Sequence, residues 1–273
     1  MQKPVIAMIY DFDKTLCTKD MQEYGFIPSL GMSADEFWGA VNELTDREQM
    51  DSILAYMFMM VKMAHEKNTS VSRDTFLNLG KGVQYFEGVE AWFDRITRYG
   101  EEIGVTVEHY IVSSGIKEII EGTGIAKYFK KIYACEFMYR DNVIQWPKMA
   151  VNYTAKTQFM FRINKGVLDI DSKSAMELNR YTPEDERRVP FRNMIYIGDG
   201  PTDVPCMKLI KSYGGQAICV YDPEKGDSRA LPLLRDDRVN FIAPADYREG
   251  KRLEHVVQTI IRKMAAESEM INM

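Results

Sequence analysis

The sequence predicts an α/β fold that combines a parallel sheet with a smaller helical domain inserted after the first strand. Two observations predict the sheet. Short apolar runs rich in Val, Ile and Tyr end at Gly, Asp or Ser, and helical patterns separate these runs along the chain. A third observation predicts the insertion, because one long stretch after the first run holds helical patterns and no convincing strand.

Four apolar runs are expected to be buried parallel strands. They are VIAMIY before Asp11, VEHYIV before Ser113, NMIYI before Gly198 and QAICVY before Asp222. Helical patterns cover Val89–Gly100 and Ile116–Gly122, and an apolar stripe from Leu253 to Met264 marks the last helix. Strands that alternate with helices are typical of crossover connections, which indicate a parallel sheet.

The inserted helical domain is predicted to take residues 19–85, and the sheet domain residues 1–18 and 86–273. Helices are expected within the insertion at Ala34–Leu44 and Gln49–Glu66. The second helix is crowded with Met side chains, which are expected to be core, with the lining of an adaptable pocket as the alternative. Further along, Glu136–Trp146 is expected to form a hairpin and Asn179–Arg192 a surface loop.

Composition excludes several classes of protein. The 273 residues include 35 Lys and Arg against 40 Asp and Glu, and the resulting charge of −5 argues against a nucleic-acid partner. The four cysteines are scattered, so neither a zinc site nor a disulfide framework is expected. The apolar stretches Val5–Tyr10 and Ile53–Ala64 are too short for a signal-peptide core and a membrane span, respectively. We therefore expect a soluble, cytoplasmic protein with no membrane partner.

The first chemical motif is Asp11-Phe12-Asp13-Lys14-Thr15, directly after the first predicted strand. Ligands of open α/β sheets bind beyond the carboxyl ends of the strands, so both carboxylates are expected where chemistry takes place. The alternative is a purely structural turn, in which Asp11 and Thr15 bond to backbone N–H groups.

The second motif is Gly198-Asp199-Gly200-Pro201-Thr202-Asp203, again at a strand end. Glycines on both sides of Asp199 allow a ligand to approach the backbone closely. Asp203 is expected in the first turn of the next helix, facing the same end of the sheet. Capping of that helix by Thr202 or Asp203 is the alternative explanation.

Two weaker signals lie between these motifs. Ile111-Val112-Ser113-Ser114-Gly115 leads from a strand to a helix, where a hydroxyl and free N–H groups form an anion site or, alternatively, a helix cap. The other is Lys156, in Thr154-Ala155-Lys156-Thr157. A single lysine more often lies on the solvated surface than in a functional site.

The order of these signals carries a resemblance. A strand followed by D-x-D-x-T, a strand followed by S-S-G, a lysine, and a strand followed by G-D-x-x-x-D occur in the sequence in that order. The chain resembles the haloacid dehalogenase superfamily over nearly its whole length. It is most similar to the phosphoserine phosphatase-like branch, in which a helical cap follows the first strand. The resemblance implies a Rossmann-like sheet core and an inserted α-helical cap.

The resemblance also implies roles for individual residues. Asp11 would be the nucleophile that forms an aspartyl-phosphate, and Asp13 the acid and base. Mg²⁺ would be held by the carboxylates of Asp11 and Asp199 and by the backbone carbonyl of Asp13, an oxygen-only set that suits this ion. Ser113 and Lys156 would bind phosphate oxygens. Asp203 would orient Lys156 or a metal-bound water, and Thr15 would stabilise the turn.

Elementary electrostatics agrees with these roles. A carboxylate approaches a dianionic phosphate only if their repulsion is offset, as Mg²⁺ and a lysine would do. Asp13 poses a second requirement. With an ordinary pKa near ~3.9 it would be almost fully ionised at pH 7, so an acid catalyst here needs a raised pKa, which burial under the cap supplies.

The function expected from the resemblance is therefore a Mg²⁺-dependent phosphatase acting on a small phosphorylated metabolite. Dehalogenases of this superfamily lack the second acid, because a halide leaves without a proton, so Asp13 disfavours that activity. A phosphotransferase that uses the same intermediate is one alternative, and a non-catalytic binding or regulatory protein on the same fold is another. Metal-dependent turnover of a chromogenic aryl phosphate would distinguish an enzyme from the non-catalytic protein.

The substrate is expected to be recognised by the cap. Asp20 stands where phosphoserine phosphatases commonly carry a glutamate for the substrate amine, although it equally suits a helix cap. Those enzymes also use a cap arginine for the substrate carboxylate. The cap arginines here, Arg47 and Arg73, lie in no matching context. We therefore expect phosphoserine not to be the best substrate.

Overall fold

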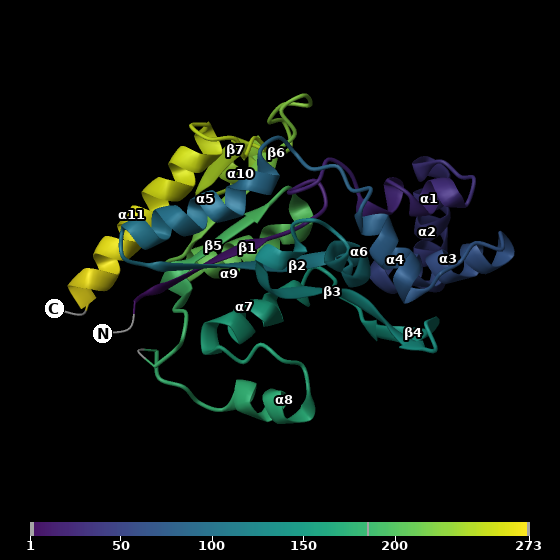
Figure 1. The fold of residues 1–273 in the computed structure, drawn as a ribbon, viewed down its shortest axis with the longest axis horizontal. Coiled ribbons are helices and arrows are strands. Elements are labelled where there is room, and N and C mark those ends of the chain that lie inside the picture. Colours follow the sequence, from purple (N-terminus) through teal and green to yellow (C-terminus); the bar gives the residue numbers. More distant parts are fainter. Residues whose placement is uncertain (1–2, 185, 272–273) are drawn as a thin grey trace.

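A computed structural model describes residues 3–184 and 186–271. In these residues seven strands form one sheet, in the order β4-β3-β2-β1-β5-β6-β7. Every neighbouring pair is parallel except β3 and β4, which form an antiparallel hairpin. The predicted α/β fold with a parallel sheet is confirmed (Figure 1).

The strands agree closely with the apolar runs of the sequence. Their bounds are β1 Val5–Tyr10, β2 Thr106–Ile116, β3 Phe129–Arg140, β4 Val143–Met149, β5 Met194–Gly198, β6 Gln216–Tyr221 and β7 Phe241–Pro244. The expectation that the second strand ends before Ser113 is wrong. β2 runs on to Ile116 because its pairing with β3 resumes there, opposite Cys135, after an irregularity.

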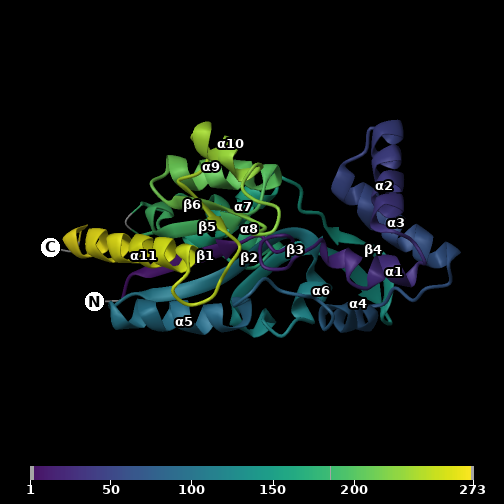
Figure 2. The ribbon, with the colours of Figure 1, turned by 90° about the horizontal axis from the view of Figure 1, so that it is seen from above.

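Helices cover both faces of the sheet. Figure 2 shows α5 (Val89–Glu102) on one face and α9 (Val204–Ser212) on the other, and α11 (Arg252–Ile271) lies alongside α5. The residues of β1 from Ile6 to Tyr10 are fully buried as a result, which explains why that strand is continuously apolar. The other elements of this half are α6 Lys117–Glu121, η2 Ala126–Tyr128, α7 Lys156–Lys165, α8 Ser172–Asn179, η3 Phe191–Asn193, η4 Pro201–Asp203 and α10 Ala230–Arg235.

The stretch between β1 and α5 is helical, as expected. It contains η1 Met21–Glu23, α1 Phe26–Ser29, α2 Ala34–Glu48, α3 Ser52–Glu66 and α4 Arg73–Gly80, and Figure 1 shows α1, α2 and α3 beyond one end of the sheet. We call residues 19–85 the cap; their division from the rest of the chain as a separate domain stays a prediction.

Local signals in the sequence set the helix boundaries of the cap. The Ser33 side chain accepts the N–H of Glu36, whose carboxylate accepts the N–H of Ser33, and this capping box begins α2. Asp51 caps α3 in a similar way. The methionines of α3 are cap core, since Met57 and Met60 are fully buried.

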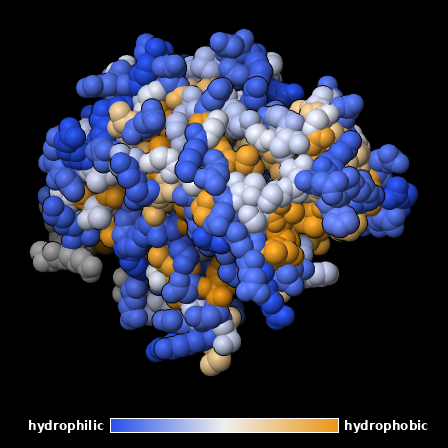
Figure 3. All heavy atoms as spheres, turned by 45° about the vertical axis from the view of Figure 1, so that its right-hand side comes forward, coloured by the Kyte–Doolittle hydropathy of each residue, from blue (hydrophilic) through white to orange (hydrophobic). Residues whose placement is uncertain are grey.

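The hairpin of β3 and β4 also forms where the sequence predicts it. Its turn contains Asp141 and Asn142, both at positive φ, a conformation that these two residue types tolerate. Trp146 on β4 is 70% exposed. Figure 3 shows hydrophilic atoms over most of the face that has the cap side forward, with apolar atoms gathered in patches between them. No helix in the described part of the chain has the length and apolar character needed to cross a membrane.

The last cap helix, α4, packs against the core, and the ring of its Phe76 also lies 6.1 Å from that of Phe26 on α1. Helix α4 contacts α6 at two glycines: a Cβ on Gly80 would lie 2.2 Å from the carbonyl oxygen of Ile119, and one on Gly122 would lie 1.9 Å from that of Leu77. The two backbones therefore approach one another at a distance that only glycine permits.

The substitution Gly122→Ala is expected to lower the free energy of unfolding by about 1–3 kcal/mol, because the added methyl group forces α4 and α6 apart. Denaturant unfolding measures this change. Gly39→Ala is the matched control, since nothing lies within 4 Å of its added Cβ on α2. That variant is expected to gain about 0.5–1 kcal/mol from the higher helix propensity of alanine. Equal stability of the two variants would contradict the close contact.

Candidate active site

The carboxyl ends of β1 and β5 carry the two acidic motifs. These strands are direct neighbours, and the N–H of Asp11 donates to the carbonyl oxygen of Ile197 at 2.9 Å. Asp11 follows the last residue of β1, and Asp199 follows the last residue of β5. Parallel pairing in register thus brings together two carboxylates that are nearly two hundred residues apart in the sequence.

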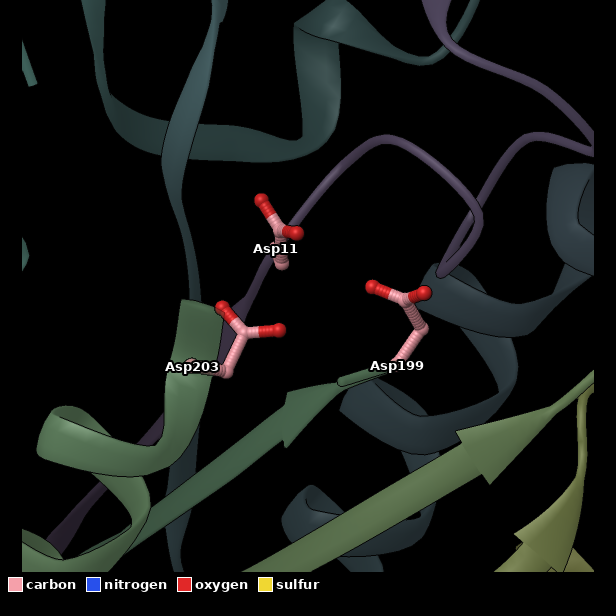
Figure 4. A group of neighbouring side chains, drawn as sticks. All are labelled: Asp11, Asp199 and Asp203. Carbon is pink, nitrogen blue, oxygen red and sulfur yellow. The ribbon is translucent and has the colours of Figure 1, made fainter. Parts of the chain in front are cut away.

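A third carboxylate completes a cluster. One oxygen from each of Asp11, Asp199 and Asp203 lies within 4.8 Å of the others, and Figure 4 shows the three side chains converging beyond the strand ends. Asp203 belongs to the short helix η4, which turns back over β5. Gly198 makes this return possible, because a Cβ there would lie only 2.4 Å from Oδ2 of Asp203.

Lys156 supplies the positive charge among these acids. Its Nζ atom lies 3.0 Å from Oδ1 of Asp11 and donates to Oδ1 of Asp203 at 2.8 Å. The side chain is only 1% exposed. Burial alone would lower its pKa, but Asp11 and Asp203 more than offset this and raise it, so the lysine stays charged. The Tyr196 hydroxyl donates to the same Asp203 oxygen at 2.7 Å.

The cluster carries more negative than positive charge. Burial, together with the neighbouring carboxylates, raises the pKa of Asp11 to about 6 and that of Asp199 to about 8. Oδ2 of Asp203 is buried and accepts no hydrogen bond from the described residues. Unpaired buried carboxylate oxygens are costly, and hard oxygen donors are the ligands that Mg²⁺ and similar divalent cations prefer. The residues present therefore fit a divalent cation.

Asp13 lies on the cap side of this cluster, and it accepts a hydrogen bond from the cap. Its Oδ1 accepts the N–H of Met21 at 2.8 Å, at the start of the cap. Burial and then the charges of Asp20 and Asp11 raise the pKa of Asp13 well above its usual range. This raised pKa favours the protonated form of the side chain, which is the form that an acid catalyst needs.

Two other predicted residues, Ser113 and Thr15, are buried in the interior. Ser113 is fully buried, its hydroxyl accepts the N–H of Gly115 at 3.0 Å, and it is not among the described residues that line the cavity next to the cluster. Its role in phosphate binding stays a prediction. Thr15 is also fully buried, and its carbonyl oxygen accepts the Tyr247 hydroxyl at 2.7 Å.

Asp20 is engaged within the protein. Lys14, which occupies the variable position of the first motif, donates to its carboxylate at 2.5 Å. The pair lies at the edge of the same cavity. The sequence suggested Asp20 as a partner for a substrate amine, but it gave no sign that Lys14 already pairs with this carboxylate.

A cavity of about 330 Å³ separates the cap from the acidic cluster. The core side of its wall includes Asp11, Lys156, Asp199 and Tyr153. Apart from Asp20, the cap side is built from uncharged side chains: Gln22 of η1, Trp38, Val41 and Asn42 of α2, and Ser52, Ile53 and Tyr56 of α3. Sequence reasoning missed these residues, because no local motif marks them.

Comparison with known proteins agrees with the geometry. Residues 8–208 match the model of the haloacid dehalogenase-like hydrolases, and the chain belongs to this family. An uncharacterized protein of Borreliella burgdorferi is 30% identical over 277 residues, which cover 91% of this chain and 94% of that protein.

Two solved structures have a similar fold. A phosphoserine phosphatase in a substrate-bound complex matches with a TM-score of 0.57 and 12% identity, over 94% of this chain and 99% of that chain. A haloacid dehalogenase family hydrolase from Salmonella enterica serovar Typhi also matches with a TM-score of 0.57 and 17% identity, over 89% of this chain and 69% of that chain. The expected Rossmann-like core of this superfamily is thereby confirmed.

The substitution Lys156→Met is expected to lower the free energy of unfolding by about 3–5 kcal/mol at pH 7.5, because it leaves buried carboxylates without a counter-charge. The loss should be smaller at pH 5. Removal of the lysine moves the pKa of Asp11 still further above its unfolded value of 3.8, so the variant loses stability as the pH rises.

Urea unfolding at the two pH values, without divalent cations, measures this effect. Lys208→Met, which removes an exposed lysine of α9, is the matched control and should change stability by less than about 0.5 kcal/mol. A Lys156→Met variant as stable as this control would show that the ammonium does not stabilise the cluster.

Proposed function

We propose that the protein is a Mg²⁺-dependent phosphatase that hydrolyses a small phosphomonoester through an aspartyl-phosphate. One observation carries the proposal: two aspartates two positions apart line the same cavity in different surroundings. Asp11 is held against the ammonium of Lys156, whereas Asp13 accepts the N–H of Met21 at the start of the cap, where burial and neighbouring acids raise its pKa. A nucleophile and an acid are the two groups that this reaction requires.

In the first step, a carboxylate oxygen of Asp11 attacks phosphorus, and the bond from phosphorus to the leaving oxygen breaks. Asp13 gives its proton to that oxygen, which departs as an alcohol. In the second step, the Asp13 carboxylate accepts a proton from water as the water oxygen attacks phosphorus. The acyl phosphate bond then breaks, which releases inorganic phosphate and restores both aspartates.

The supporting residues hold charge and position. Lys156 offsets the negative charge of Asp11 and of a phosphate beside it, and Asp203 fixes the ammonium by its 2.8 Å hydrogen bond. Asp11, Asp199 and the backbone carbonyl of Asp13 would hold Mg²⁺, with Asp203 next to them. Mg²⁺ bound there would supply the remaining positive charge that a dianionic phosphate needs.

The substitution Asp11→Asn is expected to reduce phosphatase activity by about a thousandfold or more, because the amide is a poor nucleophile. Hydrolysis of p-nitrophenyl phosphate with Mg²⁺ measures the change, and circular dichroism verifies the fold. Asp222→Asn makes the same replacement directly after β6, the strand next to β5, and should leave the rate nearly unchanged. Near-native turnover by a folded Asp11→Asn variant would disprove the mechanism.

The substitution Asp199→Ala is expected to raise the Mg²⁺ concentration for half-maximal activity by at least about tenfold, since it removes a ligand. Calorimetric titration with Mg²⁺ gives a second measure that does not depend on turnover. Calcium is expected to inhibit the wild-type protein, because its larger and looser coordination disturbs the approach of Asp11 to phosphorus. Full activity in excess chelator would overturn the role of the metal.

A further inference from the structure

We propose that the cap side of the cavity selects a phosphomonoester whose leaving group is uncharged and partly apolar, and that Gln22 recognises a hydrogen-bond donor on it. The inference rests on the proposed phosphatase function, because it concerns the same cavity. It assigns the class of substrate and a specificity-determining residue, and three features of the wall support it.

The first feature is the distribution of charge. All charged side chains of the wall lie in the two acidic motifs or pair with them: Asp11, Asp13, Lys14, Asp20, Lys156 and Asp199. Lys156 is shared between Asp11 and Asp203, and Lys14 is paired with Asp20. No described cation of the wall is therefore left for a carboxylate on the leaving group.

The arginines of the cap do not change this conclusion. Arg47 pairs with Glu43 and Glu48, and Arg73 pairs with Glu121. Neither arginine belongs to the described wall of the cavity. A carboxylate brought under the cap would lose its hydration without gaining a partner, which is unfavourable. Among the cap residues of the described wall, an amine would meet one acid, Asp20, whose charge Lys14 already offsets.

The second feature is the apolar surface that the cap presents. Trp38 uses its indole N–H to donate to Glu23 at 3.2 Å, and Tyr56 uses its hydroxyl to donate to the carbonyl oxygen of Ser114 at 2.6 Å. Since their polar atoms are engaged, both residues offer ring surface to the cavity, next to the aliphatic side chains of Val41 and Ile53. This wall favours a leaving group with apolar surface.

The third feature is an unpartnered amide. Gln22 is 2% exposed and lies in the wall, and its carboxamide oxygen is buried and accepts no hydrogen bond from any described residue. Buried polar atoms of side chains are nearly always paired. A hydroxyl or N–H on the leaving group would satisfy this oxygen, so the carboxamide distinguishes a leaving group that has a donor from one that has none.

Five aryl phosphates test the inference, because they share one scaffold: phenyl phosphate and its hydroxymethyl and carboxylate derivatives, each substituted at the 3- or the 4-position. The wild-type protein with Mg²⁺ is expected to hydrolyse the better hydroxymethyl isomer with a kcat/KM at least about tenfold above that of either carboxylate. Hydrolysis of a carboxylate derivative as fast as the better hydroxymethyl derivative would overturn the inference. Failure to hydrolyse any of the five would instead overturn the phosphatase function.

Gln22→Leu tests the carboxamide itself. The ratio of kcat/KM for the hydroxymethyl derivative to that for phenyl phosphate is expected to fall to about one, while phenyl phosphate is still hydrolysed. Gln84→Leu makes the same change at an exposed cap residue outside the described wall and should keep the wild-type ratio. An unchanged ratio in Gln22→Leu would exclude recognition by Gln22.

A charge added to the wall tests the selection against carboxylates without altering a buried residue. Asn42 is exposed on α2 and lines the cavity, so Asn42→Lys is expected to fold. The kcat/KM of the carboxylate derivative relative to phenyl phosphate should rise about tenfold in this variant. Asn78→Lys adds the same charge on α4, outside the described wall, and should not change that ratio. Equal ratios in both variants would overturn the proposed cause of selectivity.

Discussion

The ammonium of Lys156, held between Asp11 and Asp203, is the interaction on which the rest of this site depends. The two carboxylates lie side by side in the interior, at 5% and 0% exposure, where their repulsion is little screened by water. Parallel pairing of β1 with β5 brings in Asp11, and helix α7 brings in the lysine. One positive charge does not balance the three carboxylates of the cluster, and the remaining excess of negative charge favours a divalent cation there.

Two parts of the chain, the strand ends of the core and the cap, contribute different kinds of side chain to the cavity wall. Charged groups lie along the strand ends and the loop after β1, and uncharged side chains cover them from the cap. Contacts across the cavity fix this arrangement: the Tyr56 hydroxyl donates to the carbonyl oxygen of Ser114, and the Asn152 amide donates to Asp51. Asp20 is the one charged cap residue in the described wall, and it is paired with Lys14. The cap therefore shields the charged groups of the core from water without adding an unpaired charge to the cavity.

Identical side chains acquire different properties in this site. Asp11 and Asp13 are two positions apart, but one faces an ammonium and the other faces a cap N–H and two further acids. Such a difference in surroundings is how environment sets paired carboxyl groups apart in other enzymes. The backbone turn after β1 makes this possible, because it places Asp13 at the start of the cap while Asp11 stays beside Lys156.

The sequence by itself determined the sheet strands that end at the acidic motifs, the helical stretch after the first strand and the hairpin, and it singled out the aspartates and the lysine that meet at the strand ends. These follow from local patterns: continuous apolar runs, capping residues, and turn residues such as Asp141 and Asn142. Only the tertiary structure decided the pairing of Lys14 with Asp20, the contact of Gly80 and Gly122 between α4 and α6, and the place of Gln22 in the wall. Each of these depends on how a helix or loop packs against distant parts of the chain, and such packing leaves no periodic or spaced signal in the sequence.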